Sequence, residues 1–476
     1  MAKSAKTVTT KAVANKATAG KTVAEPVEQE AANPTGRVVV ASMIGTTIEF
    51  YDFYAYATAA VLVFPTMFFP SFSPTAGLLL SFATYGAAMI ARPFGAIVFG
   101  HFGDKYGRKA TLIASLLVMG IGTLLIGFLP TFQHVGVWAP LGLLVLRLMQ
   151  GFALGGEWSG AVLVAVENAP HGKRAWFGVF PQLGAPIGFI LSNGLFLLIN
   201  KTVAQGAGVA NSAFATWGWR VPFICSVIMV AIGLYVRMHL VESHAFSSAV
   251  KEDKIVKVPF FAMWRTHWLQ LILGTFYMLA TYVVFYLMTT FTLTFGTANP
   301  LGAAAPPPAK PSPAAGLGFG YNSFIAMMIV AVVFFGIFTA VAGPLADAIG
   351  RKKMLIVVTI FIIGFGFLFT PMLEGGAQWV MAFLIIGFML MGLTFGPMGA
   401  LLPELFPTNI RYSGSGFSYN VSSILGAAVA PLIAVWLWKL DNGRPTYVGI
   451  YLACMGVLTL IALIIGKETK DVDIDV

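Results

Sequence analysis

Twelve apolar segments follow one another along this chain of 476 residues, and each is long enough to cross a lipid bilayer as a helix. The hydrocarbon core of a bilayer takes about 20 apolar residues in helical form. Inside lipid every backbone N–H and C=O group has to be bonded within the protein, and a helix achieves this within one segment. We therefore expect an all-α membrane protein with twelve transmembrane helices, at residues 38–64, 76–101, 110–130, 137–165, 174–200, 218–240, 268–295, 321–346, 352–372, 378–403, 411–438 and 446–466.

Composition supports a membrane protein and argues against several other classes. Hydrophobic residues make up 58% of the chain and charged residues only 10%, whereas a soluble domain has about 25% charged residues. The net charge of +10 comes without a stacking motif or a basic recognition helix, so we expect no nucleic-acid partner. Cys225 and Cys454 both lie in apolar runs; this favours packed thiols over a disulfide framework or a metal site.

Lys and Arg residues are distributed unevenly between the two sides of the predicted membrane. Of the 29 cationic residues, 22 lie in the loops and tails of one side, with Arg237 counted among them, and five lie on the other side. Cytoplasmic loops carry an excess of Lys and Arg. The distribution therefore predicts a multi-pass protein of the inner (plasma) membrane with both termini in the cytoplasm.

The polar stretches divide the chain into segments. Residues 1–36 are rich in Ala, Lys and Thr and hold almost no large apolar side chain, which is typical of disorder. A charged link separates the first six spans from the last six. The predicted segments are a disordered cytoplasmic tail (1–36), a first six-helix bundle (37–240), a cytoplasmic linker (241–267), a second six-helix bundle (268–466) and a cytoplasmic tail (467–476).

Two loop motifs return at nearly half the chain length. GHFGDKYGRKATL (100–112) follows the second span and GPLADAIGRKKML (343–355) follows the eighth, while a Glu…Pro…Arg pattern follows both the fourth and the tenth. One copy would fit a simple positive-inside turn, but two copies at matching places indicate two related halves. We assign gating or structural roles to the residues of these motifs: Gly100, Asp104, Gly107, Arg108, Glu167, Arg174, Gly343, Asp347, Gly350, Arg351, Glu404 and Arg411.

These paired loops resemble the signature of the major facilitator superfamily. The stretches EFYDFYAYATAAVLVFP, ARPFGAIVFGHFGDKYGRKA, RLMQGFALGGEWSGA and WGWRVPF are similar to its metabolite:proton symporter branch, which includes shikimate, α-ketoglutarate, citrate and proline/betaine carriers. The resemblance runs from about residue 38 to 466. It implies twelve helices in two pseudo-symmetric six-helix bundles around a central cavity.

Five ionisable residues lie inside the predicted spans, and all are in the first half: Glu49, Asp52, Arg92, Arg147 and Glu157. Such groups are functional candidates because lipid disfavours charge. At 1.5 Å per residue, Glu49, Arg92 and Glu157 share one level and Asp52 and Arg147 a higher one. Two interpretations stay open: structural ion pairs, or carboxylates that load and release a proton beside an arginine. For proton coupling, Asp52 with Arg147 is our first choice and Glu49 and Glu157 our second.

Substrate contacts have to come from both halves if the cavity alternates in its access. Tyr282 and Tyr286 are four residues apart and so lie on one helical face, where they form either ordinary packing or the wall of a site for a small anion. The candidate substrate-binding residues are Arg92, Gln150, Gln182, Asn193, Tyr282, Tyr286, Tyr419 and Asn420.

These features favour proton-coupled uptake of a small organic acid, shikimate-like, by alternating access. Alternatives are uptake of a zwitterionic compatible solute such as proline or betaine, a uniporter or exchanger, and a metabolite sensor. The chain has no G-x-x-x-x-G-K-[ST] loop for ATP and no set of residues typical of an enzyme. We expect no cofactor and no metal, the proton as coupling ion, the lipid bilayer and a small molecule as partners, and a monomer.

Overall fold

Helices account for most of the described residues in a computed structural model, which describes residues 35–106, 108–207, 209, 211–238, 264–299, 315–408 and 410–472. The predicted tail at 1–36 lies almost entirely outside these residues, as does most of the linker at 241–267. The first-half helices are α1 (Thr35–Leu62), α2 (Phe64–Met67), α3 (Pro74–Tyr106), α4 (Arg108–Phe128), α5 (Phe132–Val135), α6 (Trp138–Leu154), α7 (Glu157–Glu167), α8 (Arg174–Gln182), α9 (Gly184–Thr202), α10 (Ala213–Thr216) and α11 (Val221–Met238).

The second half also consists mainly of long helices. Its elements are α14 (Trp268–Tyr286), α15 (Thr292–Thr297), α16 (Tyr321–Ile349), α17 (Arg351–Gly366), α18 (Phe369–Leu373), α19 (Ala377–Glu404), α20 (Arg411–Ser423), α21 (Ala430–Leu440) and α22 (Thr446–Ile465). Among the described residues, ten helical segments are long and apolar enough to cross a membrane. The other two predicted spans are occupied by α1 and by α17, which has 16 residues.

Several spans are interrupted near their middle. The fourth breaks between α6 and α7 at Gly155 and Gly156, and the fifth breaks at Leu183, two residues after Pro181. Proline removes a backbone donor and bends a helix. In the second half, single π-turns at Leu287–Phe291 and Ile424–Ala428 join α14 to α15 and α20 to α21. By contrast, α19 continues through Pro397 and Pro403.

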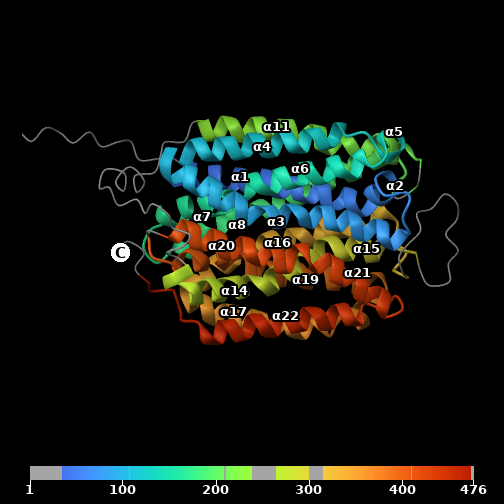
Figure 1. Cartoon of the computed structure of the whole chain (residues 1–476). Helices are drawn as coiled ribbons and strands as arrows, with labels where there is room; N and C mark the ends of the chain where they lie inside the picture. The colour runs from blue at the N-terminus through green and yellow to red at the C-terminus, as the bar shows by residue number, and fades with distance from the viewer. Residues whose placement is uncertain are drawn as a thin grey trace, which may run out of the picture. The chain divides into compact units, whose positions relative to one another are not determined.

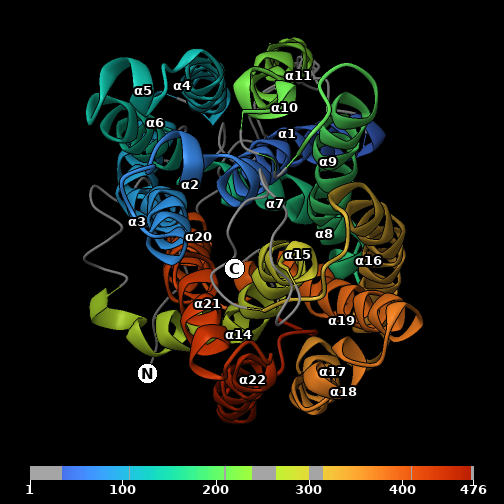
Figure 2. The same ribbon diagram turned by 90° about the vertical axis from the view of Figure 1, so that its right-hand side faces the viewer.

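First-half and second-half helices meet along two seams. On one side α3 packs against α20 and α21, and on the other α8 and α9 pack against α16 and α19. In Figure 1 the long helices lie side by side, and Figure 2 looks along them, so that both seams can be followed. Groups on α1, α3, α6, α14 and α20 are thereby brought toward one another between the two halves.

Candidate functional site

Two carboxylates on α1 lie one turn apart, and both are buried. Glu49 is 0% exposed and accepts a hydrogen bond from Nη2 of Arg92 on α3, at 2.5 Å. The sequence-based estimate of a shared level for these two residues is therefore confirmed. Oε2 of Glu49 and Nε of Arg92 have no hydrogen-bond partner, so the pair is only partly satisfied.

Asp52 takes part in a different contact, through a threonine that the sequence analysis did not single out. Its Oδ2 accepts a hydrogen bond from Oγ1 of Thr123 on α4, at 2.6 Å. Nε2 of Gln150 donates to the same Oγ1 at 2.6 Å, and Nη1 of Arg147 donates to Oε1 of Gln150 at 2.9 Å. A chain of three hydrogen bonds thus connects Asp52 to Arg147.

The candidate coupling residues Asp52 and Arg147 are connected through Thr123 and Gln150 and not by a direct ion pair. Among the ion pairs of the described residues, which extend to 4.0 Å, none joins these two side chains. The physical reason is that Thr123 and Gln150 occupy the space between the carboxylate and the guanidinium. Oδ1 of Asp52 is buried without a partner.

Aromatic rings surround the guanidinium of Arg147. Its Cζ lies 4.0 Å from the ring centroid of Tyr56, 5.2 Å from that of Tyr85 and 5.4 Å from that of Phe53. Ring faces attract a cation but satisfy none of its N–H donors. Arg147 is 1% exposed, and its Nε and Nη2 atoms have no acceptor. The arrangement therefore holds a buried positive charge that can still receive an anion.

Glu157 pairs with a residue that the sequence analysis placed elsewhere. Its Oε1 accepts from Nη2 of Arg237 on α11, and Arg237 also donates to the carbonyl of Leu112 at 2.5 Å. Counting Arg237 among the cytoplasmic loop residues is a mistake, because the side chain is buried on the last turn of α11. Among the described residues, Glu157 therefore forms no ion pair with Arg92 or Arg147.

Three of the predicted substrate-binding residues connect helices. Gln182 accepts from the indole N–H of Trp158 at 3.0 Å and donates to the carbonyl of Phe395 on α19 at 2.9 Å. Asn420 on α20 donates to the carbonyl of Gly155 at 2.8 Å, at the break between α6 and α7. Asn193 accepts from Thr58 at 2.7 Å, within the first half. Gln182 and Asn420 therefore bridge the two halves.

The predicted tyrosines gather in one aromatic group between the halves. Tyr282 lies 6.4 Å from Tyr286 and 5.3 Å from Tyr419 by ring centroids, and Tyr286 lies 5.7 Å from Tyr85 of the first half. Tyr419 stacks on Trp158. The hydroxyl of Tyr282 is buried and has no partner, so this group contributes an unpaired polar atom near the arginines.

The second copy of the loop motif joins the two halves. Asp347 accepts hydrogen bonds from the backbone N–H groups of Ala175 and Trp176, at 3.1 and 2.9 Å, and so caps the first turn of α8. Arg351 binds both Asp347 and Glu404 at 3.0 Å. Gly350 separates α16 from α17 with φ of 102°, a conformation that glycine adopts without strain.

The other motif residues of the described part of the chain form contacts near the ends of their helices. Arg174 donates to the carbonyl of Val472 at 2.5 Å, and Arg411 donates to that of Phe406 at 3.2 Å. Gly343 packs where α16 meets α8, and Glu167 ends α7. In the first copy of the motif, Gly107 lies outside the described residues, and at Gly100, Asp104 and Arg108 the structure describes the backbone only.

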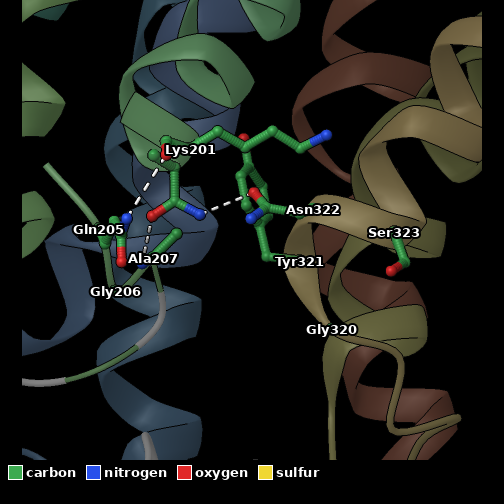
Figure 3. A pocket seen from close by; sticks show the side chains of 9 residues that line it. Lys201, Gln205, Gly206, Ala207, Gly320, Tyr321, Asn322 and Ser323 are labelled. Carbon is green, nitrogen blue, oxygen red and sulfur yellow. Dashed lines mark hydrogen bonds between the residues drawn. The ribbon is translucent and has the colours of Figure 1, made fainter. Parts of the chain in front are cut away.

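A polar pocket lies apart from these groups. It has a volume of about 430 Å³ and sits between the end of α9 and the start of α16, where Asn200 donates to Asn322 at 2.7 Å (Figure 3). Lys201 brings a positive charge to its lining. Of the described residues that line the pocket, none is a predicted substrate-binding residue.

Comparison with known proteins agrees with this architecture. The sequence matches the family described as sugar (and other) transporter over residues 38–257 and 314–475. It is 54% identical over 440 residues to the inner membrane metabolite transport protein YhjE of Escherichia coli K12, covering 92% of this chain and 95% of that one. It is 32% identical to the shikimate transporter of Escherichia coli K12, covering 91% and 95%, and 30% identical to the proline/betaine transporter of the same organism, covering 91% and 84%.

Solved structures show the same fold at low sequence identity. The proton:xylose symporter XylE bound to 6-bromo-6-deoxy-D-glucose aligns with a TM-score of 0.71 at 17% identity, covering 93% of this chain and 98% of that one. This likeness confirms the predicted twelve-helix fold.

Proposed function

Because the chain belongs to the major facilitator superfamily, in its sugar (and other) transporter family, we propose that it carries a small organic acid into the cell together with protons. The family consists of membrane transporters, so the chain is a transporter of metabolites and not an enzyme. The choice of an organic acid and of the proton is supported by the charges described above.

The proposal rests on the buried side chain of Arg147, which has N–H groups without an acceptor. A buried cation without an ion-pair partner is costly, because its solvation by water is lost and no carboxylate in contact with it replaces that solvation. Nε and Nη2 of Arg147 have no acceptor. A substrate carboxylate would accept both N–H groups in the planar geometry that a guanidinium favours. The phenol rings of Tyr56 and Tyr85 would flank such an anion.

Asp52 supplies the group that would carry the proton. It is buried, forms no ion pair among the described residues, and has one oxygen without a partner. A carboxylate without a fixed cation can become neutral without leaving an arginine unpaired. Glu49 and Glu157 each hold an arginine, so we assign them the secondary roles of positioning Arg92 and Arg237.

Uptake of a zwitterionic compatible solute is the second candidate. Relatives named as glycine betaine/proline/ectoine/pipecolic acid and proline/betaine transporters support it. The aromatic group formed by Tyr282, Tyr286, Tyr419 and Trp158 supports it as well, because aromatic faces attract quaternary ammonium groups. Both candidates place a carboxylate on Arg147 and differ in the rest of the ligand.

Transport would follow alternating access between the two halves. The motif residues Asp347, Arg351 and Glu404 then hold the predicted cytoplasmic ends together in one state and release them in the other. We further propose that both termini face the cytoplasm, that the protein works as a monomer in the inner membrane, and that a cytoplasmic linker at 241–267 connects the two six-helix halves.

A binding screen followed by a transport assay tests this function. Purified protein is first screened by thermal shift against organic acids and compatible solutes at two pH values. The stabilising compound is then added to proteoliposomes that contain a pH indicator. Symport of the added compound into the vesicles predicts acidification of the vesicle interior. Uptake without proton movement would indicate a uniporter or exchanger, and a lack of counterflow of labelled substrate would indicate a sensor.

A further inference from the structure

Thr123 occupies a position between two acceptors and one donor. Its Oγ1 lies 2.6 Å from Oδ2 of Asp52 and 3.1 Å from the backbone carbonyl of Met119, one turn earlier on α4. It also lies 2.6 Å from Nε2 of Gln150. A hydroxyl group has one proton to donate and two lone pairs that accept, so Thr123 can donate to only one of its two acceptors at a time.

The two protonation states of Asp52 need different arrangements of that hydroxyl. When Asp52 is ionised, Thr123 donates to Oδ2 and accepts from Gln150. When a proton sits on Oδ2, Asp52 becomes the donor, and the Thr123 hydroxyl turns to the carbonyl of Met119. Oγ1 then accepts from both Asp52 and Gln150, so each of its lone pairs is used. Oδ2 of Asp52, the hydroxyl of Thr123 and Nε2 of Gln150 therefore each have a partner in both states.

We propose that Thr123 is a hydroxyl switch that partners Asp52 in both its ionised and its protonated state while it keeps its hydrogen bond from Gln150. Thr123 is a positioning residue, since it acts through Asp52. This inference rests on the proposed proton-carrying role of Asp52. Its physical advantage is that a buried carboxyl group can change charge without losing its hydrogen-bond partner, a loss that is costly in a dry interior.

The other ionisable groups around Asp52 each hydrogen-bond to a residue other than Asp52. Its electrostatic neighbours are Arg147 on α6, Glu157 on α7, and Glu49 on α1, with Tyr51 close by on the same helix. Glu49 binds Arg92 of α3 and Glu157 binds Arg237 of α11, while the Tyr51 hydroxyl donates to the carbonyl of Pro222. Among these described neighbours, Thr123 is the side chain that hydrogen-bonds to Asp52.

Infrared spectroscopy of the full-length protein in lipid vesicles tests the switch without any substrate. The carbonyl stretch of a protonated carboxyl group appears on acidification and is assigned to Asp52 by its loss in Asp52→Asn. In the wild-type protein the acid proton is bonded to Thr123, which lowers the stretching frequency. Thr123→Val has nearly the same shape but no hydroxyl, so we expect the Asp52 band at the higher frequency of a free carboxyl group.

Two further variants make the test specific. Thr123→Ser retains the hydroxyl, and we expect the wild-type frequency. Thr123→Cys offers a weaker donor and acceptor, and we expect a frequency between those of the serine and valine variants; this variant also serves if the valine variant cannot be reconstituted. An unshifted band in Thr123→Val would overturn the switch and leave the role of Asp52 intact. No Asp52-dependent band in the wild type would overturn both.

Discussion

The indole ring of Trp158 on α7 lies flat against the phenol ring of Tyr419 on α20, with ring centroids 3.9 Å apart and planes 5° apart. The two rings come from opposite halves of the protein. Beside them Asn420 donates to the carbonyl of Gly155, and the hydroxyl of Tyr412 donates to that of Gly156. The broken fourth span is thus fastened to the eleventh at the place where its own backbone hydrogen bonds are interrupted.

Removing the ring of Tyr419 should favour separation of the halves at the predicted cytoplasmic end. An aromatic pair contributes about 0.5–1.5 kcal/mol beyond its buried area, so we expect Tyr419→Leu to raise the ratio of separated to closed molecules by about 2- to 12-fold. Electron spin resonance distances measure this ratio between labels at the exposed positions 173 and 353, with Cys225 and Cys454 replaced by serine.

Tyr419→Phe is the matched control for this experiment, because it keeps the ring and removes the hydroxyl. We expect its distance distribution to match that of the parent protein. If the leucine and phenylalanine variants behave alike, the stacked pair does not hold the halves together.

Replacing Arg147 by lysine should weaken binding of an organic acid although the charge is kept. Lysine lacks the planar fork that binds both oxygens of a carboxylate, and a hydrogen bond to a charged group contributes about 1.5–3 kcal/mol. We expect the Kd of the acid found by the binding screen to rise by about tenfold or more. Arg444→Lys, at an exposed arginine, is the control; equal affinities in both variants would show that Arg147 does not bind the carboxylate.

Replacing one partner of the Glu157–Arg237 pair should destabilise the protein more than replacing both partners. Glu157→Gln leaves the guanidinium of Arg237 buried without its carboxylate, and loss of one partner of a buried pair costs about 3–5 kcal/mol. We expect a lowered thermal unfolding midpoint for this variant and a partial recovery in Glu157→Gln with Arg237→Met. A double variant as unstable as the single one would mean that the pair is not energetically coupled.

Close packing of α3 against α6 should make Gly151 intolerant of any side chain. A Cβ atom there would overlap the backbone of Ala88, whereas one at Gly194 on α9 would meet nothing within 4 Å. Small residues allow membrane helices to approach in this way. We expect Gly151→Ala to lower the yield of folded, monodisperse protein and Gly194→Ala to leave it unchanged. Normal yield from Gly151→Ala would mean that the two helices have room to separate.

The helical fold was predictable because apolar length alone determines a membrane span. The level of each charge could also be estimated, since the rise per residue along a helix is fixed, and this found the contact between Glu49 and Arg92. Rotation about the helix axis has no comparable signal in one sequence. For that reason Asp52 was matched to Arg147, the residue at its height, although its carboxylate faces Thr123 on a different helix.

Other features of the site have little or no recognisable pattern in the sequence. Thr123 lies in an apolar run and resembles any threonine in a membrane helix, whose hydroxyl commonly bonds to its own backbone. Arg237 lies near the end of its span, where a sequence cannot separate a loop residue from a buried one. The π-turns at Leu287–Phe291 and Ile424–Ala428 arise from packing between helices rather than from a local pattern.

The central claim is that Asp52 carries the proton that drives uptake, and accumulation in proteoliposomes with an imposed pH gradient tests it most directly. Asp52→Asn resembles the protonated acid and cannot release a proton. We predict that this variant exchanges labelled substrate across the membrane at a rate close to that of the wild type but does not accumulate it, while Glu374→Gln, at an exposed carboxylate, behaves as the wild type. Accumulation by Asp52→Asn against a concentration gradient would contradict the account.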